Sequence, residues 1–234
     1  DMQDVSEQRD VRHQLCNSGD NDACFAIEFG ACADRNPRIA IPACSRQLAV
    51  RDDRRTGGNT RFERAIRYML RANAYMRQGD MERALSDYDL AVTADGTVFW
   101  MHTQRGDANF LAGNFEEALA SYDAALALDP DLASVLSNRA LVYAAAPDDE
   151  VRNPQQALAD AERANALAPG QPAYIDGLAV AHAANGNFDR AIAELQRAID
   201  LLPSDMPEVM DDYRKRLALY QQGMPYQIVP RPQS

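Results

Sequence analysis

The sequence predicts an all-α fold, a solenoid of about four helical hairpins, and two observations support it. The first is a repeat, because the stretch at 77–96 reads RQGDMERALSDYDLAVTADG and the stretch at 111–130 reads LAGNFEEALASYDAALALDP. Shared residues recur 34 positions apart, namely Gly79 and Gly113, Ala84 and Ala118, Tyr88 and Tyr122, and Ala91 and Ala125. Such a period is typical of stacked helical hairpins. The second is abundant alanine, which favours helices and lets their axes approach.

The first 60 residues form a separate block with weaker helical signals. Residues 1–12 are polar. Short helices are expected around Val11–Cys16, over Asp22–Phe29 closed by Gly30, and over Pro37–Arg51. The segment 51–60 contains Gly57 and Gly58, and its composition is that of a linker. We therefore expect an N-terminal helical block and linker over residues 1–60.

All four cysteines lie in this block, at Cys16, Cys24, Cys32 and Cys44. An even number of cysteines in the least regular part of the chain predicts two disulfides and an oxidising compartment. Reduced structural thiols and a zinc site are the competing interpretations. A metal is disfavoured because the spacing lacks the close cysteine pairs that present two thiolates to one zinc ion. We expect no metal and no cofactor.

Three connectivities are possible for four cysteines. On one unbroken helix, the Cα atoms of Cys24 and Cys32 would lie about 12 Å apart, too far for a disulfide. Gly30 could break that helix, so the pairing stays open. We favour Cys16–Cys44 enclosing Cys24–Cys32, because the outer bridge would close a loop of about 29 residues and stabilise by roughly 3.5 kcal/mol in the chain-entropy model.

From Arg61 the helical pattern is nearly continuous. The first hairpin is expected to pair Arg61–Arg77 with Met81–Thr93, and the second to pair Thr97–Leu111 with Phe115–Leu128. Gly79 and Gly113 are expected to close the first helix of each hairpin. Asn114 and Asp131 are expected as N-caps, and Pro130 prevents the preceding helix from continuing.

The repeated small and aromatic residues resemble the tetratricopeptide repeat (TPR). In the second hairpin the matching residues are Gly106, Gly113, Phe115, Ala118, Tyr122, Ala125 and Pro130. In the first they are Ala72, Tyr75, Gly79, Ala84, Tyr88 and Ala91. The third supplies Ala140, Tyr143, Ala157, Ala164 and Pro169, and the fourth Ala179, Gly186, Phe188, Ala191, Leu195, Ala198 and Pro203. The third departs from the pattern, since its turn at 147–154 is about five residues longer than the family's and Ala161 replaces an aromatic residue.

This resemblance covers residues 61–203 and implies a right-handed solenoid that binds proteins. A looser one concerns the N-terminal block, where Ala43, Cys44, Ser45 and Arg46 resemble a motif of exported TPR proteins of alphaproteobacterial type. After Pro203, Pro207–Gln222 is expected to form an amphipathic capping helix within residues 204–222. Three prolines make the tail, residues 223–234, extended.

Composition excludes several classes of function. The net charge is −11 and the pI about 4.7, which argues against nucleic acid or anionic lipid as the main partner. No run of residues is apolar enough to cross a bilayer, so we expect no direct membrane insertion. The chain starts at Asp1, as a mature exported protein would after removal of its leader, and as a chain trimmed at its start would too. With the cysteines, this predicts a periplasmic or secreted location.

In a TPR array the first helices of successive hairpins line a concave groove. The resemblance places these residues in it: Ile66, Met69, Asn73, Met76, Trp100, Thr103, Asp107, Phe110, Leu111, Asn138 and Leu141. Asp176, Val180 and Ala184 follow in the fourth hairpin, and the groove is expected to be apolar at its N-terminal half and small-walled at its C-terminal half. A charged clamp for a partner's C-terminal carboxylate is not expected, because Met69 and Asn138 occupy clamp positions. Trp100 and Phe110 are the expected anchors, although Trp100 could instead pack between hairpins.

Catalysis finds little support in the sequence. The three histidines, His13, His102 and His182, lie on separate predicted elements, and His182 is expected to be buried in place of a packing tyrosine. The sequence therefore predicts a non-enzymatic adaptor or accessory subunit of a multisubunit, membrane-associated envelope complex that binds protein partners through its groove. The alternative is a structural subunit bound through its convex face, N-terminal block or tail, with the groove empty or filled by the tail segment YQIVP at 226–230.

Overall fold

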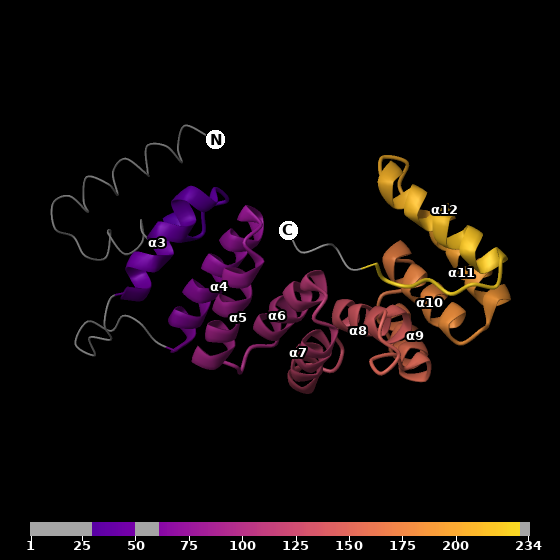
Figure 1. The fold of residues 1–234 in the computed structure, drawn as a ribbon, viewed down its shortest axis with the longest axis horizontal. Coiled ribbons are helices and arrows are strands. Elements are labelled where there is room, and N and C mark those ends of the chain that lie inside the picture. The colour runs from indigo at the N-terminus through magenta and orange to yellow at the C-terminus, as the bar shows by residue number, and fades with distance from the viewer. Residues whose placement is uncertain (1–29, 50–60, 230–234) are drawn as a thin grey trace. The chain divides into compact units, whose positions relative to one another are not determined.

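The computed structural model describes residues 30–49 and 61–229, and these fold into helices with no strand among them (Figure 1). The helices are α3 (Pro37–Ala49), α4 (Arg61–Gln78), α5 (Met81–Ala94), α6 (Phe99–Ala112), α7 (Phe115–Leu128), α8 (Ala133–Ala145), α9 (Pro154–Leu167), α10 (Pro172–Ala184), α11 (Phe188–Leu201) and α12 (Pro207–Gln221). The predicted all-α fold of helical hairpins is confirmed. The chain divides into two compact units, Asp1–Thr97 and Val98–Ser234, and each is described by itself.

The first unit contains one complete hairpin, α4 with α5, and the helix α3 packed against α4. Gly79 follows α4 with a φ of 82°, a left-handed conformation that glycine adopts without steric strain. Asp80 then caps α5 by accepting the backbone N–H of Arg83. The turn glycine that the repeat predicted is therefore confirmed.

A disulfide joins Cys32 to Cys44, with their Cα atoms 4.7 Å apart. The favoured pairing of Cys44 with Cys16 and of Cys24 with Cys32 is therefore wrong. The reason is a tight turn: the N–H of Asp34 donates to the carbonyl of Ala31, and the side chain of Asp34 accepts the N–H of Asn36. This turn brings Cys32 against α3. Cys16, Cys24 and the helices expected before residue 30 lie outside the described residues.

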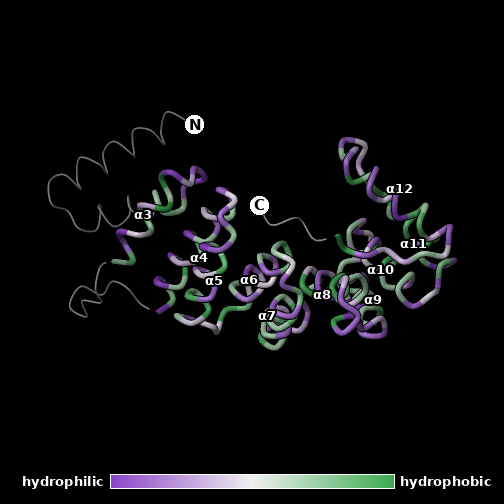
Figure 2. Tube along the Cα trace, viewed as in Figure 1, coloured by the Kyte–Doolittle hydropathy of each residue, from purple (hydrophilic) through white to green (hydrophobic). Residues whose placement is uncertain are grey.

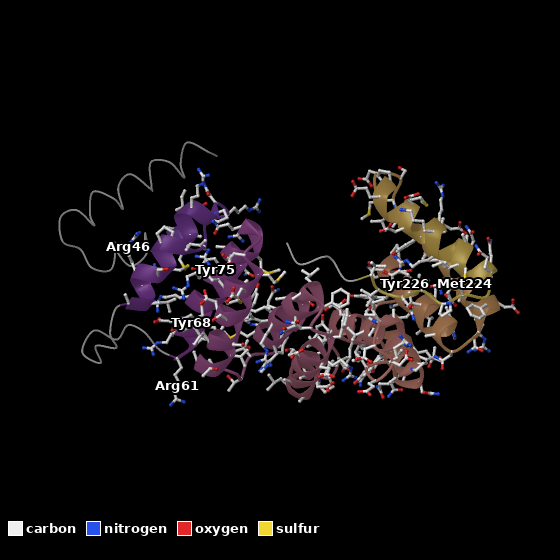
Figure 3. All side chains as sticks on the ribbon, viewed as in Figure 1. Arg46, Arg61, Tyr68, Tyr75, Met224 and Tyr226 are labelled. Atoms are coloured by element: carbon white, nitrogen blue, oxygen red, sulfur yellow. A yellow bond between two sulfur atoms is a disulfide. The ribbon has the colours of Figure 1, made fainter. Side chains whose placement is uncertain are left out.

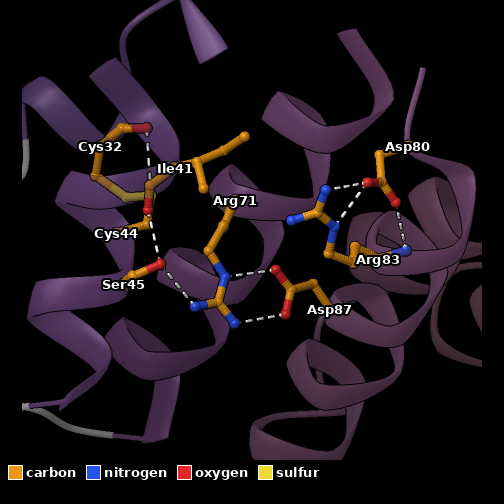
Figure 4. A network of polar contacts seen from close by, with 8 residues as sticks. All are labelled: Cys32, Ile41, Cys44, Ser45, Arg71, Asp80, Arg83 and Asp87. Carbon is orange, nitrogen blue, oxygen red and sulfur yellow. Dashed lines mark hydrogen bonds and ion pairs between the residues drawn. A yellow bond between two sulfur atoms is a disulfide. The ribbon is translucent and has the colours of Figure 1, made fainter. Parts of the chain in front are cut away.

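A chain of polar contacts connects the disulfide region to the first hairpin (Figure 4). Ser45, the residue after Cys44, donates its hydroxyl to the carbonyl of Ile41 and accepts Nη1 of Arg71 at 3.0 Å. Arg71 also makes a bidentate pair with Asp87, at 2.6 and 2.7 Å. One arginine on α4 thus holds α3 on one side and α5 on the other.

The second unit stacks the hairpins α6–α7, α8–α9 and α10–α11 and ends with α12. Apolar residues of neighbouring hairpins share clusters, and the one around Tyr122 joins α7 to α8 and to Ala164 of α9. Gly106 allows the close approach of α6 and α7, because a Cβ added there would lie 2.5 Å from Cε1 of Tyr122. Tyr122 itself is completely buried.

Specific hydrogen bonds define the turn within the third hairpin and the turn that precedes α8. In the long turn of the third hairpin, the N–H of Asn153 donates to the carbonyl of Tyr143, and the Asn153 side chain caps α9. The predicted cap at Asp131 is wrong, because α8 has Leu132 at its N-cap. In this turn the side chain of Asp129 accepts the N–H of Asp131, and Asp131 lies before the N-cap.

The amphipathic capping helix is present as α12. It buries Tyr213 and Tyr220 against the last hairpin, while acidic and basic side chains such as Asp212 and Lys215 remain exposed. Hydrophilic residues accordingly occupy much of α12 in Figure 2. The segment 224–229 that follows is not helical, as predicted, and it runs back from α12 across α10 (Figure 1).

Candidate functional site

The groove residues predicted on α4 all lie half-buried. They are Ile66, Met69, Asn73 and Met76. Asn73 is engaged within the unit, because its side-chain oxygen accepts the hydroxyl of Tyr88 at 2.5 Å. Ile66, Met69 and Met76 are therefore partly accessible on α4, and their role in a groove stays a prediction.

The groove residues predicted on α6 and α8 divide into packing residues and accessible ones. Asp107 accepts the hydroxyl of Tyr122 at 2.9 Å and the side-chain amide of Asn138 at 3.0 Å. Burial raises the pKa of the Asp107 carboxyl, and these two hydrogen bonds oppose the rise. Phe110 packs edge-on against Phe115, with ring centroids 6.0 Å apart. Asp107, Asn138 and Phe110 therefore hold α6, α7 and α8 together.

Three further predicted groove residues lie on α6. Trp100 and Thr103 are half-buried, and Leu111 is 46% exposed. Residues 100, 103, 107 and 111 form one stripe of the helix, because 11 residues correspond to about three full turns. Thr103 donates its hydroxyl to the carbonyl of Phe99 within the helix. Trp100 and Leu111 are thus the apolar side chains at the two ends of this stripe.

One set of repeated contacts was not predicted from the sequence, although its residues recur with the period of 34 residues. Arg71, Arg105 and Arg139 lie 34 residues apart on α4, α6 and α8, and each bonds to the second helix of its own hairpin. The acceptors are Asp87, the hydroxyl of Ser121 at 3.0 Å, and Asp160 at 2.7 and 2.8 Å. Arg139 also reaches Asp123 of the previous hairpin at 2.5 Å. These arginines fasten the hairpins internally and are not groove residues.

In the second unit the tail occupies the surface that α8 and α10 provide. The N–H of Ile228 donates to the carbonyl of Ala145 at 2.8 Å. Tyr226 and Ile228 pack on an apolar cluster that contains Val180, and two other predicted groove residues, Leu141 and Ala184, pack on that same cluster. Figure 3 labels Tyr226 on this returning segment. These contacts place residues 226 and 228 of the tail against residues that the sequence assigned to the small-walled half of the groove.

A buried ion pair lies beneath the tail. Arg216 of α12 donates Nη1 to Oδ2 of Asp176 on α10 at 2.5 Å, and both side chains are largely buried. The guanidinium carbon of Arg216 lies 5.1 Å from the ring centroid of Tyr213 and 5.2 Å from that of Tyr226. Such distances are typical of cation–π contacts. Arg216 thus connects the last hairpin, the capping helix and the tail.

Burial raises the pKa of Asp176 to about 6, although Arg216 opposes the rise, and Asp212 adds to it. An acid whose pKa is higher in the folded state stabilises the fold at low pH, and this contribution disappears as the pH rises through about 6. A rise of about 2 pH units corresponds to about 3 kcal/mol.

We therefore expect the wild type to lose about 3 kcal/mol of unfolding free energy, relative to Asp176→Asn, between pH 4 and pH 7. Urea unfolding of both chains at several pH values measures this difference. The exposed Asp205 serves as the control, because Asp205→Asn should follow the wild type across the whole range. A difference between wild type and Asp176→Asn that does not change with pH would contradict the prediction.

The described residues offer no metal site, since no three His, Cys, Asp or Glu side chains among them are arranged to hold an ion. Within the same residues, no helix is long and apolar enough to cross a membrane. His182 is buried at the tyrosine position, as predicted, and burial lowers its pKa. His13 lies outside the described residues.

Comparisons with known proteins agree with these hairpins. A TPR repeat model matches residues 106–146, and tetratricopeptide repeat models match residues 65–97 and 148–205. MamA has 19% identity and a TM-score of 0.57 over 82% of this chain and 94% of its own. A tetratricopeptide repeat protein from Parabacteroides merdae has 18% identity and a TM-score of 0.64 over 94% and 75%. YrrB, a TPR protein with an unusual peptide-binding site, has 20% identity and a TM-score of 0.50 over 68% and 82%. No curated protein sequence gave a match.

Proposed function

Because the chain belongs to the tetratricopeptide repeat family, we propose that it is an exported, non-catalytic adaptor or accessory subunit that docks onto a larger envelope complex or helps to assemble it. Proteins of this family are protein-interaction modules, and a solenoid of hairpins presents side chains along one face for a partner. The fold does not specify the partner, so the proposal depends on the surface residues.

The accessible stripe of α6 is the observation that carries the proposal. Trp100 and Leu111 lie on one side of α6. Neither takes part in the hydrogen bonds between Asp107 and its partners Tyr122 and Asn138. Tryptophan is enriched among the residues that dominate protein interfaces, and the exposed Leu111 extends the apolar surface about three helical turns further along the same stripe. We therefore place the docking site of the second unit on this stripe.

The disulfide supports the exported location. Disulfides persist in oxidising compartments such as the bacterial periplasm and are rare in the cytosol. Cys32 and Cys44 are both completely buried, so their bond closes part of the core of the first unit. A bond of this kind, rather than an exposed and easily reduced one, fits a protein that folds in an oxidising environment.

The test is capture from the envelope fraction of the native source with the full chain as bait. We expect Trp100→Ala with Leu111→Ala to reduce recovery of the partner at least 10-fold, because truncating central anchors removes most of the binding energy. The control is Leu128→Ala with Leu167→Ala, which removes similarly exposed leucines from the second helices α7 and α9. The native protein, digested without reduction, should also yield the Cys32–Cys44 linked peptide.

The contact of the tail with α8 and α10 favours a second candidate function, a structural subunit that binds through its convex face, N-terminal block or tail. The same capture separates the two candidates. Unchanged recovery with the Trp100 and Leu111 pair would contradict the groove proposal. Loss of recovery on deletion of residues 223–234 would identify the tail as the docking element, and finding Cys32 and Cys44 as free thiols would contradict export.

A further inference from the structure

The tail of the second unit alternates between inward and outward side chains. Tyr226 and Ile228 are half-buried against the hairpins, while Gln227 is exposed and Val229 is 83% exposed. This period of two is the pattern of an extended segment that lies on a surface, because its side chains point alternately toward that surface and away from it. We call the surface beneath it, formed by α8, α10 and α12, the tail seat.

The tail seat has three places that recognise different parts of the segment. The first is Arg216, whose guanidinium lies over the ring of Tyr226 and is fixed from behind by Asp176. An aromatic ring is attracted to such a cation through its negative face. Arg216 also contacts the ring of Tyr213, so two of its contacts, to Asp176 and to Tyr213, do not involve the tail.

The second place is the carbonyl of Ala145, the last residue of α8. The last four carbonyls of a helix have no N–H partner within the helix and need a donor from outside it. The N–H of Ile228 supplies that donor at 2.8 Å. This contact involves only backbone atoms, so any extended peptide other than one with proline at this position can make it.

The third place is apolar and receives the side chain of Ile228. That side chain packs against two clusters, one containing Val142 and Ala146 and the other containing Ala144, Ala145 and Ala181. Small alanine side chains in both clusters leave room for a branched aliphatic residue. The tail seat therefore accepts an aromatic residue and, two positions later, an aliphatic one.

The segment that fills the tail seat is held by few contacts of its own. Between residues 225 and 229, the backbone contact to the hairpins is the bond to Ala145. Segments with exposed backbone and few buried side chains open at low free-energy cost. The helices α8, α10 and α12 form the seat, and one backbone bond and two half-buried side chains hold its occupant.

We propose that the tail seat is a binding site for an extended segment of a partner protein with the pattern aromatic, any residue, branched aliphatic, and that the chain's own tail competes for it. This deepens the proposed function and rests on it, since the partner is a protein that docks on the first helices of the hairpins. A tethered segment has an effective concentration in the millimolar range, so the tail weakens apparent binding of a partner until it is displaced.

The test uses a fluorescent synthetic peptide with the sequence of residues 223–230, GMPYQIVP, titrated into the full chain and followed by anisotropy. We expect the Ile228→Asp chain, whose tail is released, to bind the peptide at least 10-fold more tightly than the wild type does. Val229→Asp is the matched control, because it places the same charge on the exposed neighbour and should bind as weakly as the wild type.

Changes in the peptide test the first and the third place without altering the fold of the protein. Peptides carrying Tyr226→Ala or Ile228→Asp should lose at least 10-fold in affinity for the released chain, and a peptide carrying Gln227→Ala should bind unchanged. Circular dichroism must show that the released chain keeps its helices.

Two results would overturn the proposal. One is a folded Ile228→Asp chain that binds the peptide no better than the wild type, which would make the tail a purely structural element. The other is concentration-dependent dimerisation of the wild type that Ile228→Asp abolishes, which would assign the tail seat to a second copy. The titration needs no native partner, so its failure and a failed capture from the envelope are independent results.

Discussion

Gly106→Ala is expected to destabilise the second unit by about 2 kcal/mol, although the same change in an exposed helix stabilises by up to about 1 kcal/mol. The added methyl group would lie 2.5 Å from Cε1 and 2.7 Å from Cδ1 of Tyr122. The ring cannot move away easily, because Tyr122 is completely buried and its hydroxyl donates to Asp107 at 2.9 Å. Either the ring or the helix α6 must shift.

Urea unfolding followed by the fluorescence of Trp100 measures this effect, since Trp100 is the single tryptophan of the sequence and lies on α6. The midpoint should fall by about 1 M. Gly177→Ala on α10 is the matched control, because a Cβ there meets only the hydroxyl of Ser137, at 3.1 Å, and that hydroxyl can rotate. A Gly106→Ala chain as stable as the control would contradict the packing of Tyr122.

Arg139→Ala is expected to destabilise the second unit by about 3 kcal/mol. The substitution leaves Asp160 buried, with 4% exposure, without the bidentate partner that now neutralises it. It also removes the contact of Arg139 with Asp123 and so weakens the junction between the second and third hairpins. Removing one member of a buried pair costs more than the pair contributes, because a charge remains in the interior.

Arg163→Ala provides the comparison, since Arg163 and its partner Asp131 are both at least half exposed. Exposed pairs contribute about 0 to 1 kcal/mol, so this variant should unfold within that range of the wild type. Arg139→Lys should be intermediate, because it keeps the charge but loses the bidentate geometry. Equal midpoints for Arg139→Ala and Arg163→Ala would show that the buried pair does not stabilise the hairpin.

The hairpins were predictable because their signals are local. Gly79 and Gly113 close their helices with φ values of 82°, and the expected helix bounds agree with the observed ones within two residues in the first two hairpins. Turn glycines and periodic alanines act within a few residues of their position, so the sequence expresses them directly.

The disulfide and the N-cap of α8 were not predictable in the same way. The pairing of Cys32 with Cys44 depends on the turn at Asp34 and Asn36, whose hydrogen bonds decide which thiol meets α3. The start of α8 depends on whether the side chain of Asp129 or that of Asp131 takes the nearby N–H. In both cases several arrangements satisfy the same sequence pattern.

The candidate site was predictable only in part, because a groove position and a packing position look alike in sequence. Asp107 and Asn138 are directed at each other and at Tyr122, which required knowledge of the distance between α6 and α8. The arginines at 71, 105 and 139 recur every 34 residues. Charged residues on helices are usually solvated, so this spacing alone does not predict a structural contact. Their buried acceptors appear only in the folded chain.

The bond between Ile228 and Ala145 also bears on how the second unit folds. In a stack of hairpins each element contacts its sequence neighbours, so the end hairpin can unfold while the rest remains folded. The segment after α12 is joined to α8 through Ile228, and fraying of α10, α11 and α12 must therefore break this long-range contact as well. The tail should make unfolding more cooperative, and a partner that displaces it would return the last hairpin to independent, stepwise unfolding.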